Sequence, residues 1–127
     1  MTFRIRRRPR GIWADVAALT AWLDANAAER PRWWWTRGRR RAAREHELTL
    51  RIAKCGEESG EAVDARIRAL GQNPRKGTTA TAEDVANELC DVAVTALVAL
   101  TTQLGDVDAA RTHLNTRLAA IRERAAA

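Results

Sequence analysis

Acidic residues gather at one place in a chain that is basic as a whole. The stretch KCGEESGEAVDA, residues 54 to 65, contains four acids although the 127-residue chain has a formal net charge of +6; they are Glu57, Glu58, Glu61 and Asp64. In a helix, residues three and four apart share a face, and each pair of like charges there costs about 0.2–0.5 kcal/mol. Glu61 has no cation three or four residues away on either side. A solvated charged face would mix both signs, so this pattern favours a site that holds a cation.

The segment NELCD repeats the same anomaly. Glu88 and Asp91 stand three residues apart, and neither has a cation three or four residues away. Two helices packed antiparallel would bring this pair beside Glu58 and Glu61, so that four carboxylates meet at one spot. Oxygen ligands without His or Cys favour Mg²⁺ or Mn²⁺ over zinc. The spacing therefore predicts a divalent-metal site, with Mg²⁺ as the expected cofactor and Mn²⁺ as its substitute.

Helices are the elements that must position these acids. The chain has no Tyr and one Phe, while Ala, Leu, Arg and Glu are abundant, so the sequence predicts an all-α protein. Pro31, Gly71, the capping sequence TAED at Thr81, and Gly105 with Asp106 mark the expected helix ends. The expected helices span about residues 12–28, 42–70, 82–104 and 107–124.

Short connections between these helices predict a four-helix-bundle-type domain over residues 12–127, preceded by a basic tail over 1–11. Residues 31–41, PRWWWTRGRRR, are expected to form a Trp/Arg-rich connector. Because LCDVAVTALVAL, residues 89–100, is apolar almost all round, we expect oligomerisation into a homodimer or homotetramer to complete the fold.

Apolar residues at helical spacing predict which faces of the helices are buried. In the first helix these are Trp13, Val16, Leu19, Trp22 and Leu23, and we expect Trp13 and Trp22 to lie in the core. In the second helix they are Leu48, Ile52, Cys55, Val63, Ile67 and Leu70. In the last helix they are Leu114, Leu118 and Ile121.

Positive charge is concentrated in the first third of the chain. Residues 1–46 contain twelve Arg and four acids, a net charge of +8, whereas residues 47–127 have a net charge of −2. An alternative function is therefore binding of nucleic acid or nucleotides through this basic third, because Arg neutralises phosphates. The competing interpretation is a compositional bias, because Arg greatly outnumbers Lys and Ala is abundant. No apolar signal region or membrane-length apolar run is visible, so we expect a cytoplasmic protein that has no membrane partner.

The pattern EExxE followed by ExxD resembles the MazG-like all-α nucleoside triphosphate pyrophosphohydrolases. It occurs as KCGEESGEAVDA and then NELCDVAVTALVAL, and together with GQNPRKG it is similar to the small actinobacterial MazG-like proteins over about residues 48 to 104. The resemblance implies an enzyme that cleaves a nucleoside triphosphate between the α and β phosphates, giving the monophosphate and pyrophosphate. A catalytically weak oligomeric scaffold of the same fold is a further alternative.

The resemblance also assigns roles to residues. It implies Mg²⁺ ligation by Glu58, Glu61, Glu88 and Asp91. Catalytic roles fall to Glu61 and Glu57, of which Glu57 either accepts a proton from the attacking water or holds a metal-bound water in an outer shell.

Positive charge for the substrate phosphates is expected from Lys54, one turn before Glu58, and from Arg75 and Lys76. For each of these cations the competing interpretation is an ordinary surface residue. Stacking on a nucleotide base, or an interface contact, is a weaker expectation for three adjacent indoles, Trp33, Trp34 and Trp35.

Overall fold

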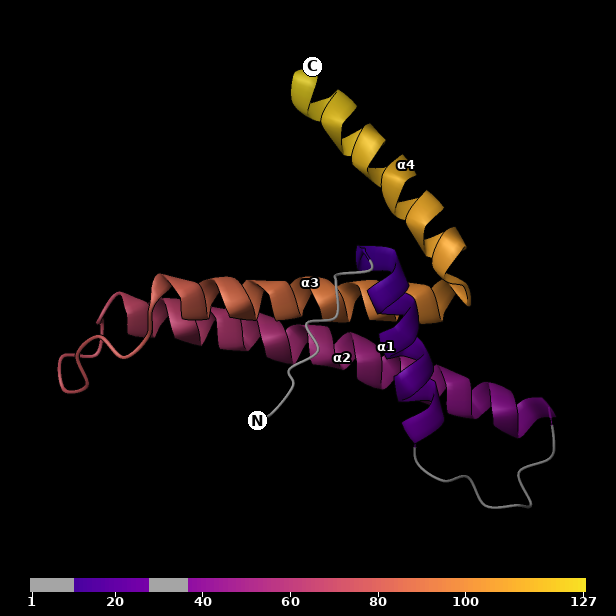
Figure 1. The fold of residues 1–127 in the computed structure, drawn as a ribbon, viewed down its shortest axis with the longest axis horizontal. Coiled ribbons are helices and arrows are strands. Elements are labelled where there is room, and N and C mark those ends of the chain that lie inside the picture. The colour runs from indigo at the N-terminus through magenta and orange to yellow at the C-terminus, as the bar shows by residue number, and fades with distance from the viewer. Residues whose placement is uncertain (1–10, 28–36) are drawn as a thin grey trace, which may run out of the picture.

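The chain folds into helices, as shown by a computed structural model that describes residues 11–27 and 37–127 (Figure 1). No strand occurs in these residues, and the prediction of an all-α protein is confirmed. The helices are α1 (Ile12–Asn26), α2 (Arg37–Ala69), α3 (Ala82–Leu104) and α4 (Val107–Ala126). Residues 1–10 and the three indoles Trp33, Trp34 and Trp35 lie outside the described residues, so the expectations for the basic tail and for base stacking stay predictions.

The helix ends lie where the local sequence predicts them. Thr81 is the N-cap of α3: its side chain accepts from the backbone N–H of Asp84, and the Asp84 carboxylate accepts in return from the Thr81 N–H at 2.7 Å. Gly105 ends α3 in the left-handed conformation, with φ of 77°. Gly71 follows α2 with φ of 62°, and a Cβ there would lie only 2.8 Å from Oγ1 of Thr78. Both turns therefore require glycine.

Helix α2 begins earlier than predicted. Its first residue is Arg37, whereas the sequence pattern predicted a start near Ala42, so residues 37–41 of the expected connector are helical. No proline follows Pro31 in this segment, and Arg and Ala are among the best helix formers.

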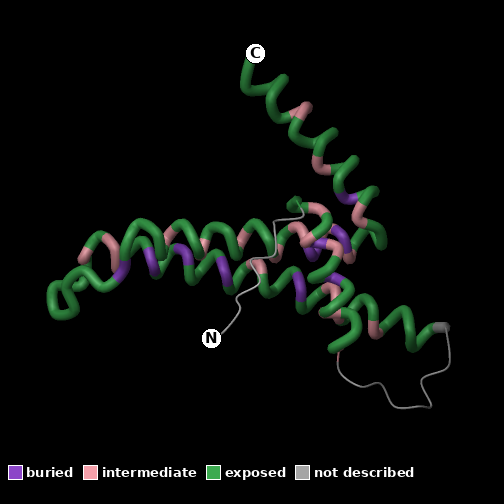
Figure 2. Tube along the Cα trace, viewed as in Figure 1, coloured by how far each residue is buried: buried purple, intermediate pink, exposed green. Residues whose placement is uncertain are grey.

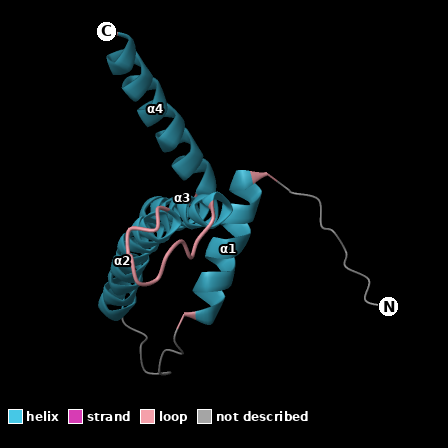
Figure 3. Ribbon diagram, turned by 90° about the vertical axis from the view of Figure 1, so that its left-hand side faces the viewer, coloured by secondary structure: helices cyan, strands magenta, loops and turns pink. Residues whose placement is uncertain are grey.

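The helices are arranged around one antiparallel pair. Helices α2 and α3 lie side by side along most of their length, α1 crosses this pair, and α4 leaves the end of α3 and points away from it (Figures 1 and 3). Within the described residues α4 packs against α3 and α1 but does not reach α2. Within one chain, the four helices of the described residues do not enclose a common core. Completion of the bundle by another copy remains a prediction.

The buried core is small and rich in alanine. Its apolar members lie mainly along the α2–α3 seam and around α1 (Figure 2), and they are Val16, Ala62, Ala65, Ala80, Val98, Ala99 and Ala110. Alanine at the seam lets the two helices approach closely, because no long side chain separates the backbones.

Several predicted core residues are exposed instead. Trp22 is 61% exposed, so its assignment to the core was wrong, while Trp13 is half-buried with the Arg111 guanidinium 5.9 Å from its ring centroid. Four residues of the apolar stripe predicted for α2 are also exposed, namely Ile52, Val63, Ile67 and Leu70. On α4, Leu118 and Ile121 are exposed because the helix projects away from the others. One chain supplies a partner for only one face of each long helix.

Helix α3 has the apolar character expected from its sequence. Among the described helices it alone is long and apolar enough to cross a membrane, by length and composition only, and core helices of soluble proteins meet the same criteria. It packs along α2, and it carries Glu88 and Asp91 on the segment that faces the α2 carboxylates.

Candidate metal centre

The inner face of α2 positions the first carboxylate. Its buried residues are spaced three, four or seven apart, as one helical stripe requires, and they are Arg51, Glu58, Ala62 and Ala65. Glu58 is 7% exposed, so its side chain lies against α3 rather than in solvent. Charged residues on a buried stripe need partners, because an unpaired buried charge is costly.

Helix α3 supplies the second half of the cluster. Carboxylate oxygens of Glu58, Glu88 and Asp91 all lie within 4.8 Å of one another. Glu58 is buried, Glu88 is half-buried and Asp91 is exposed, so the cluster opens from the helix seam toward solvent. Three of the four predicted ligands are thus brought together from two helices. Three carboxylates so close together could bind one hard divalent cation, which prefers oxygen ligands.

Glu61, the fourth predicted ligand, adjoins the cluster without belonging to its tightest group. The negative charge of Glu58 raises the pKa of the Glu61 carboxyl, and burial, a hydrogen bond shared with Glu58 and the charge of Glu88 act in the same direction. The carboxyl therefore lies close enough to both residues to experience their charge. A cation between these groups would relieve the repulsion.

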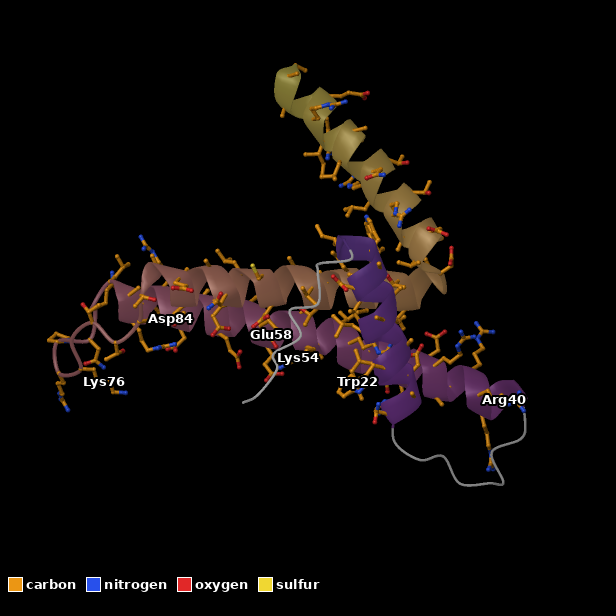
Figure 4. All side chains as sticks on the ribbon, in the orientation of Figure 1. Trp22, Arg40, Lys54, Glu58, Lys76 and Asp84 are labelled. Carbon is orange, nitrogen blue, oxygen red and sulfur yellow. The ribbon has the colours of Figure 1, made fainter. Side chains whose placement is uncertain are left out.

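Lys54 provides the positive charge that Glu58 meets in this structure. Its Nζ lies 2.7 Å from Oε1 of Glu58 and 3.1 Å from Oε2 of Glu57 (Figure 4). The hydrogen bond from Lys54 lowers the pKa of Glu58, and the two glutamates raise the pKa of Lys54. Lys54 therefore lies at the edge of the cluster, where a substrate phosphate is expected to bind.

The remaining predicted residues lie farther from the cluster. Glu57 is exposed and contacts Lys54, on the outer side of Glu58. Arg75 and Lys76 are exposed in the loop between α2 and α3, beyond the end of α2 (Figure 4). The eleven residue steps from Glu58 to Ala69 correspond to about 17 Å along the helix. The structure does not bring the two loop cations to the carboxylates, and their role in phosphate binding stays a prediction.

Arg51 is a buried charge that the sequence analysis missed. Its guanidinium contacts Oδ1 of Asp24 on α1 at 2.7 Å, Oγ1 of Thr102 on α3 at 2.7 Å and Oε1 of Glu47 at 3.3 Å. One side chain of α2 thereby ties α1 and α3 together. The signal was available in the sequence, because Arg51 lies seven residues before Glu58 and so falls on the same helical stripe.

The family model of phosphoribosyl-ATP pyrophosphohydrolase matches residues 16–117, a span that includes both carboxylate pairs. The chain belongs to the phosphoribosyl-ATP pyrophosphohydrolase family. That family is part of the MazG-like all-α superfamily, so the broader resemblance read from the motifs is confirmed, while the small actinobacterial type stays a prediction. No curated protein and no solved structure gave a match.

Membership in the phosphoribosyl-ATP pyrophosphohydrolase family fits the carboxylate cluster. The family indicates a hydrolase that acts on a phosphoanhydride of a nucleotide, and its members typically depend on a divalent metal. The oxygens of Glu58, Glu88 and Asp91 are hard donors of the kind that such metals prefer.

Proposed function

We propose that this chain is a divalent-metal-dependent pyrophosphohydrolase that cleaves the α–β phosphoanhydride of a nucleoside triphosphate and releases the monophosphate and pyrophosphate. The proposal rests above all on the convergence of Glu58, Glu88 and Asp91 oxygens within 4.8 Å. The family match supports the reaction type. Phosphoribosyl-ATP, the compound in the family's description, is itself a nucleoside triphosphate derivative and belongs to the proposed substrate class.

The donor set favours Mg²⁺ as the cofactor, with Mn²⁺ as a substitute. When bound, the cation supplies charge neutralisation for the phosphoryl oxygens and acidifies an attacking water. Glu58, Glu88 and Asp91 are the residues that would hold it.

Glu61 has the properties of a fourth ligand or of a proton acceptor. The pKa of its carboxyl is raised, first of all by the charge of Glu58, and a raised carboxyl pKa improves a general base. Glu57 is exposed and bound to Lys54, which supports a positioning role for Glu57 rather than proton transfer. Lys54 is expected to turn from these glutamates to the substrate phosphates once a cation neutralises Glu58.

A pyrophosphate-release screen tests the proposal. The full chain is incubated with each nucleoside and deoxynucleoside triphosphate and with phosphoribosyl-ATP, in Mg²⁺, in Mn²⁺ and in EDTA. Monophosphate and pyrophosphate should appear only with a divalent metal, and Glu61→Gln or Asp91→Asn should abolish them. Release of inorganic phosphate in place of pyrophosphate would refute the reaction type. If the chain binds metal but turns over none of these substrates, the alternative of an inactive scaffold is the better one.

We also propose that the chain works as a homodimer or homotetramer. The outward stripe of α2 exposes Val63 by 59% and Ile52 by 54%, and Leu89 on α3 is 57% exposed. Apolar residues repeated along long helices are typical of helix–helix interfaces. Light scattering after size-exclusion chromatography should give two or four times the chain mass, and a mass equal to one chain would contradict the proposal.

A further inference from the structure

A cavity lies at the N-terminal end of α2, the end opposite the loop between α2 and α3. Its volume is about 970 Å³, and it is formed where the later part of α1 and the end of α3 meet the early turns of α2. Arg40, at that end of α2, marks its position (Figure 4). Ligand pockets commonly measure about 300–1,000 Å³, so the space is sufficient for a nucleotide-sized molecule.

This cavity is separate from the carboxylate cluster. Arg44 is the lining arginine nearest in sequence to Glu58, and the fourteen residue steps from one to the other correspond to about 21 Å along the helix. Neither Glu58 nor Glu61, Glu88 or Asp91 lines the cavity in the described part of the chain. A ligand bound here would not contact the metal centre.

Three arginines from one face of α2 line the cavity. Arg40, Arg41 and Arg44 are spaced so that Arg44 lies one turn from both of the others. All three are exposed, and within residues 11–27 and 37–127 none forms an ion pair. No acid occupies the first turn of α2, so the positive end of the helix dipole adds to their charge.

The acids of the cavity do not cancel this charge. Asp24 and Glu47 both line the cavity, but each forms an ion pair with Arg51, at 2.7 Å and 3.3 Å. Glu45 is the one lining acid without an ion pair in the described part of the chain. Three unpaired guanidinium groups therefore face a single unpaired carboxylate.

The other lining groups limit which part of a ligand can bind where. The hydroxyls of Thr20, Thr101 and Thr102 donate to carbonyls of their own helices, so they have no proton left for a ligand. The main hydrogen-bond donors for a ligand are therefore the arginine guanidinium groups, whose paired N–H groups suit phosphate oxygens. Leu48 and Leu104 supply apolar surface on which a planar base can lie.

We propose that this cavity is a second binding site for a phosphate-bearing small molecule of nucleotide size, with Arg40, Arg41 and Arg44 on its phosphates. This inference goes beyond the proposed hydrolysis and does not depend on it. ATP binding by the full chain in EDTA tests it by calorimetry, because without metal the carboxylate cluster repels a triphosphate. ATP should bind, pyrophosphate should compete with it, and adenosine should not bind.

Two triple variants, each of which removes three positive charges, test where ATP binds. The first is Arg40→Gln, Arg41→Gln and Arg44→Gln together, and the matched control is Arg117→Gln, Arg122→Gln and Arg124→Gln on α4. The first should weaken ATP binding by about tenfold or more, since each charged hydrogen bond lost costs about as much, and the control should leave it nearly unchanged. Circular dichroism should give the same helical content for both, because all six side chains are exposed.

Three results would overturn the proposal. The first is that the wild-type chain does not bind ATP in EDTA. The second is that both triple variants weaken ATP binding equally, which would show that ATP is attracted unspecifically by positive charge. The third is that single-stranded RNA displaces ATP at a much lower phosphate concentration, which would show that the surface binds nucleic acid. Hydrolysis in Mg²⁺ is measured in a separate assay, so failure of the cavity to bind ATP does not imply failure of the proposed hydrolysis, or the reverse.

Discussion

Nζ of Lys54 lies 2.7 Å from Oε1 of Glu58, the buried carboxylate of the cluster. The ammonium group of Lys54 thus neutralises the same carboxylate, that of Glu58, that would ligate a metal. The ammonium is charged at neutral pH, as any lysine is, and its glutamate partners raise the pKa of Lys54 further. Lys54 and a divalent cation therefore compete for Glu58, and substrate phosphates provide the lysine with another partner.

Lys54→Met tests this relationship. Loss of the lysine should raise KM for the triphosphate by about tenfold, the value of one charged hydrogen bond, because a phosphate contact is lost. Apparent Mg²⁺ affinity should rise, since Glu58 no longer has a competing cation. Steady-state kinetics across Mg²⁺ concentrations measure both quantities. Arg117→Met, at an exposed position of α4, is the control, and the same KM change in both variants would contradict a local role for Lys54.

Addition of Mg²⁺ or Mn²⁺ should raise the melting temperature of the chain. A ligand that binds only the folded state stabilises it by mass action, by about 2.7 kcal/mol at a hundredfold excess over Kd, which corresponds to about 10 °C for a domain of this size. Glu58→Gln and Asp91→Asn should abolish the shift. Asp64→Asn should keep it, because Asp64 lies in the same motif but pairs with Arg68 at 2.7 Å. Equal shifts in all variants would mean that the metal binds elsewhere.

The capping box of α3 should make stability depend on pH in the acid range. Hydrogen bonds from Thr81, first that of its backbone N–H, lower the pKa of Asp84. A lowered folded-state pKa stabilises the fold above the ordinary aspartate value of about 3.9, and this contribution is lost as pH falls through the folded-state pKa. Wild type should therefore exceed Asp84→Asn in urea midpoint at neutral pH, and the difference should shrink below about pH 4.

Thr81→Ala is the companion variant for the same cap. It removes the hydroxyl that accepts from the Asp84 N–H and should cost about 1 kcal/mol of unfolding free energy. Glu83→Gln, in the same turn but outside the box, is the control. A wild-type advantage over Asp84→Asn that is unchanged down to pH 2 would rule out the carboxylate's contribution.

Arg51→Met should destabilise the chain more than any exposed arginine substitution. The guanidinium is 6% exposed and holds Asp24, Glu47 and Thr102, so its loss should cost about 2–3 kcal/mol, the scale of hydrogen bonds to charged groups. Urea unfolding at neutral pH measures this cost. Arg66→Met, at an exposed position of the same helix, should change the midpoint little. Similar midpoints for the two variants would mean that the tie between α1, α2 and α3 contributes little.

The sequence by itself determined the features that depend on neighbours in the chain. The box of Thr81 and Asp84, the left-handed ends at Gly71 and Gly105 and the pairing of Glu88 with Asp91 on one helix all follow from contacts within a few residues. Hydrogen bonds and helical spacing operate over one turn, so these features are the same whichever way the helices later pack. That is why the carboxylate motifs and most helix ends were predictable.

Only the tertiary structure decided which face of each helix is buried. The sequence predicted burial of the apolar stripe of α2, but the rotation of α2 against α3 buries Arg51 and Glu58 while Ile52 and Val63 remain exposed. The same rotation places Glu58, rather than Glu61, nearest to Glu88 and Asp91. Burial is a property of pairs of segments far apart in the chain, and small alanines at the seam allow a closer approach than the larger apolar stripe would. Apolar content along one helix therefore could not predict the rotation that assembled the cluster.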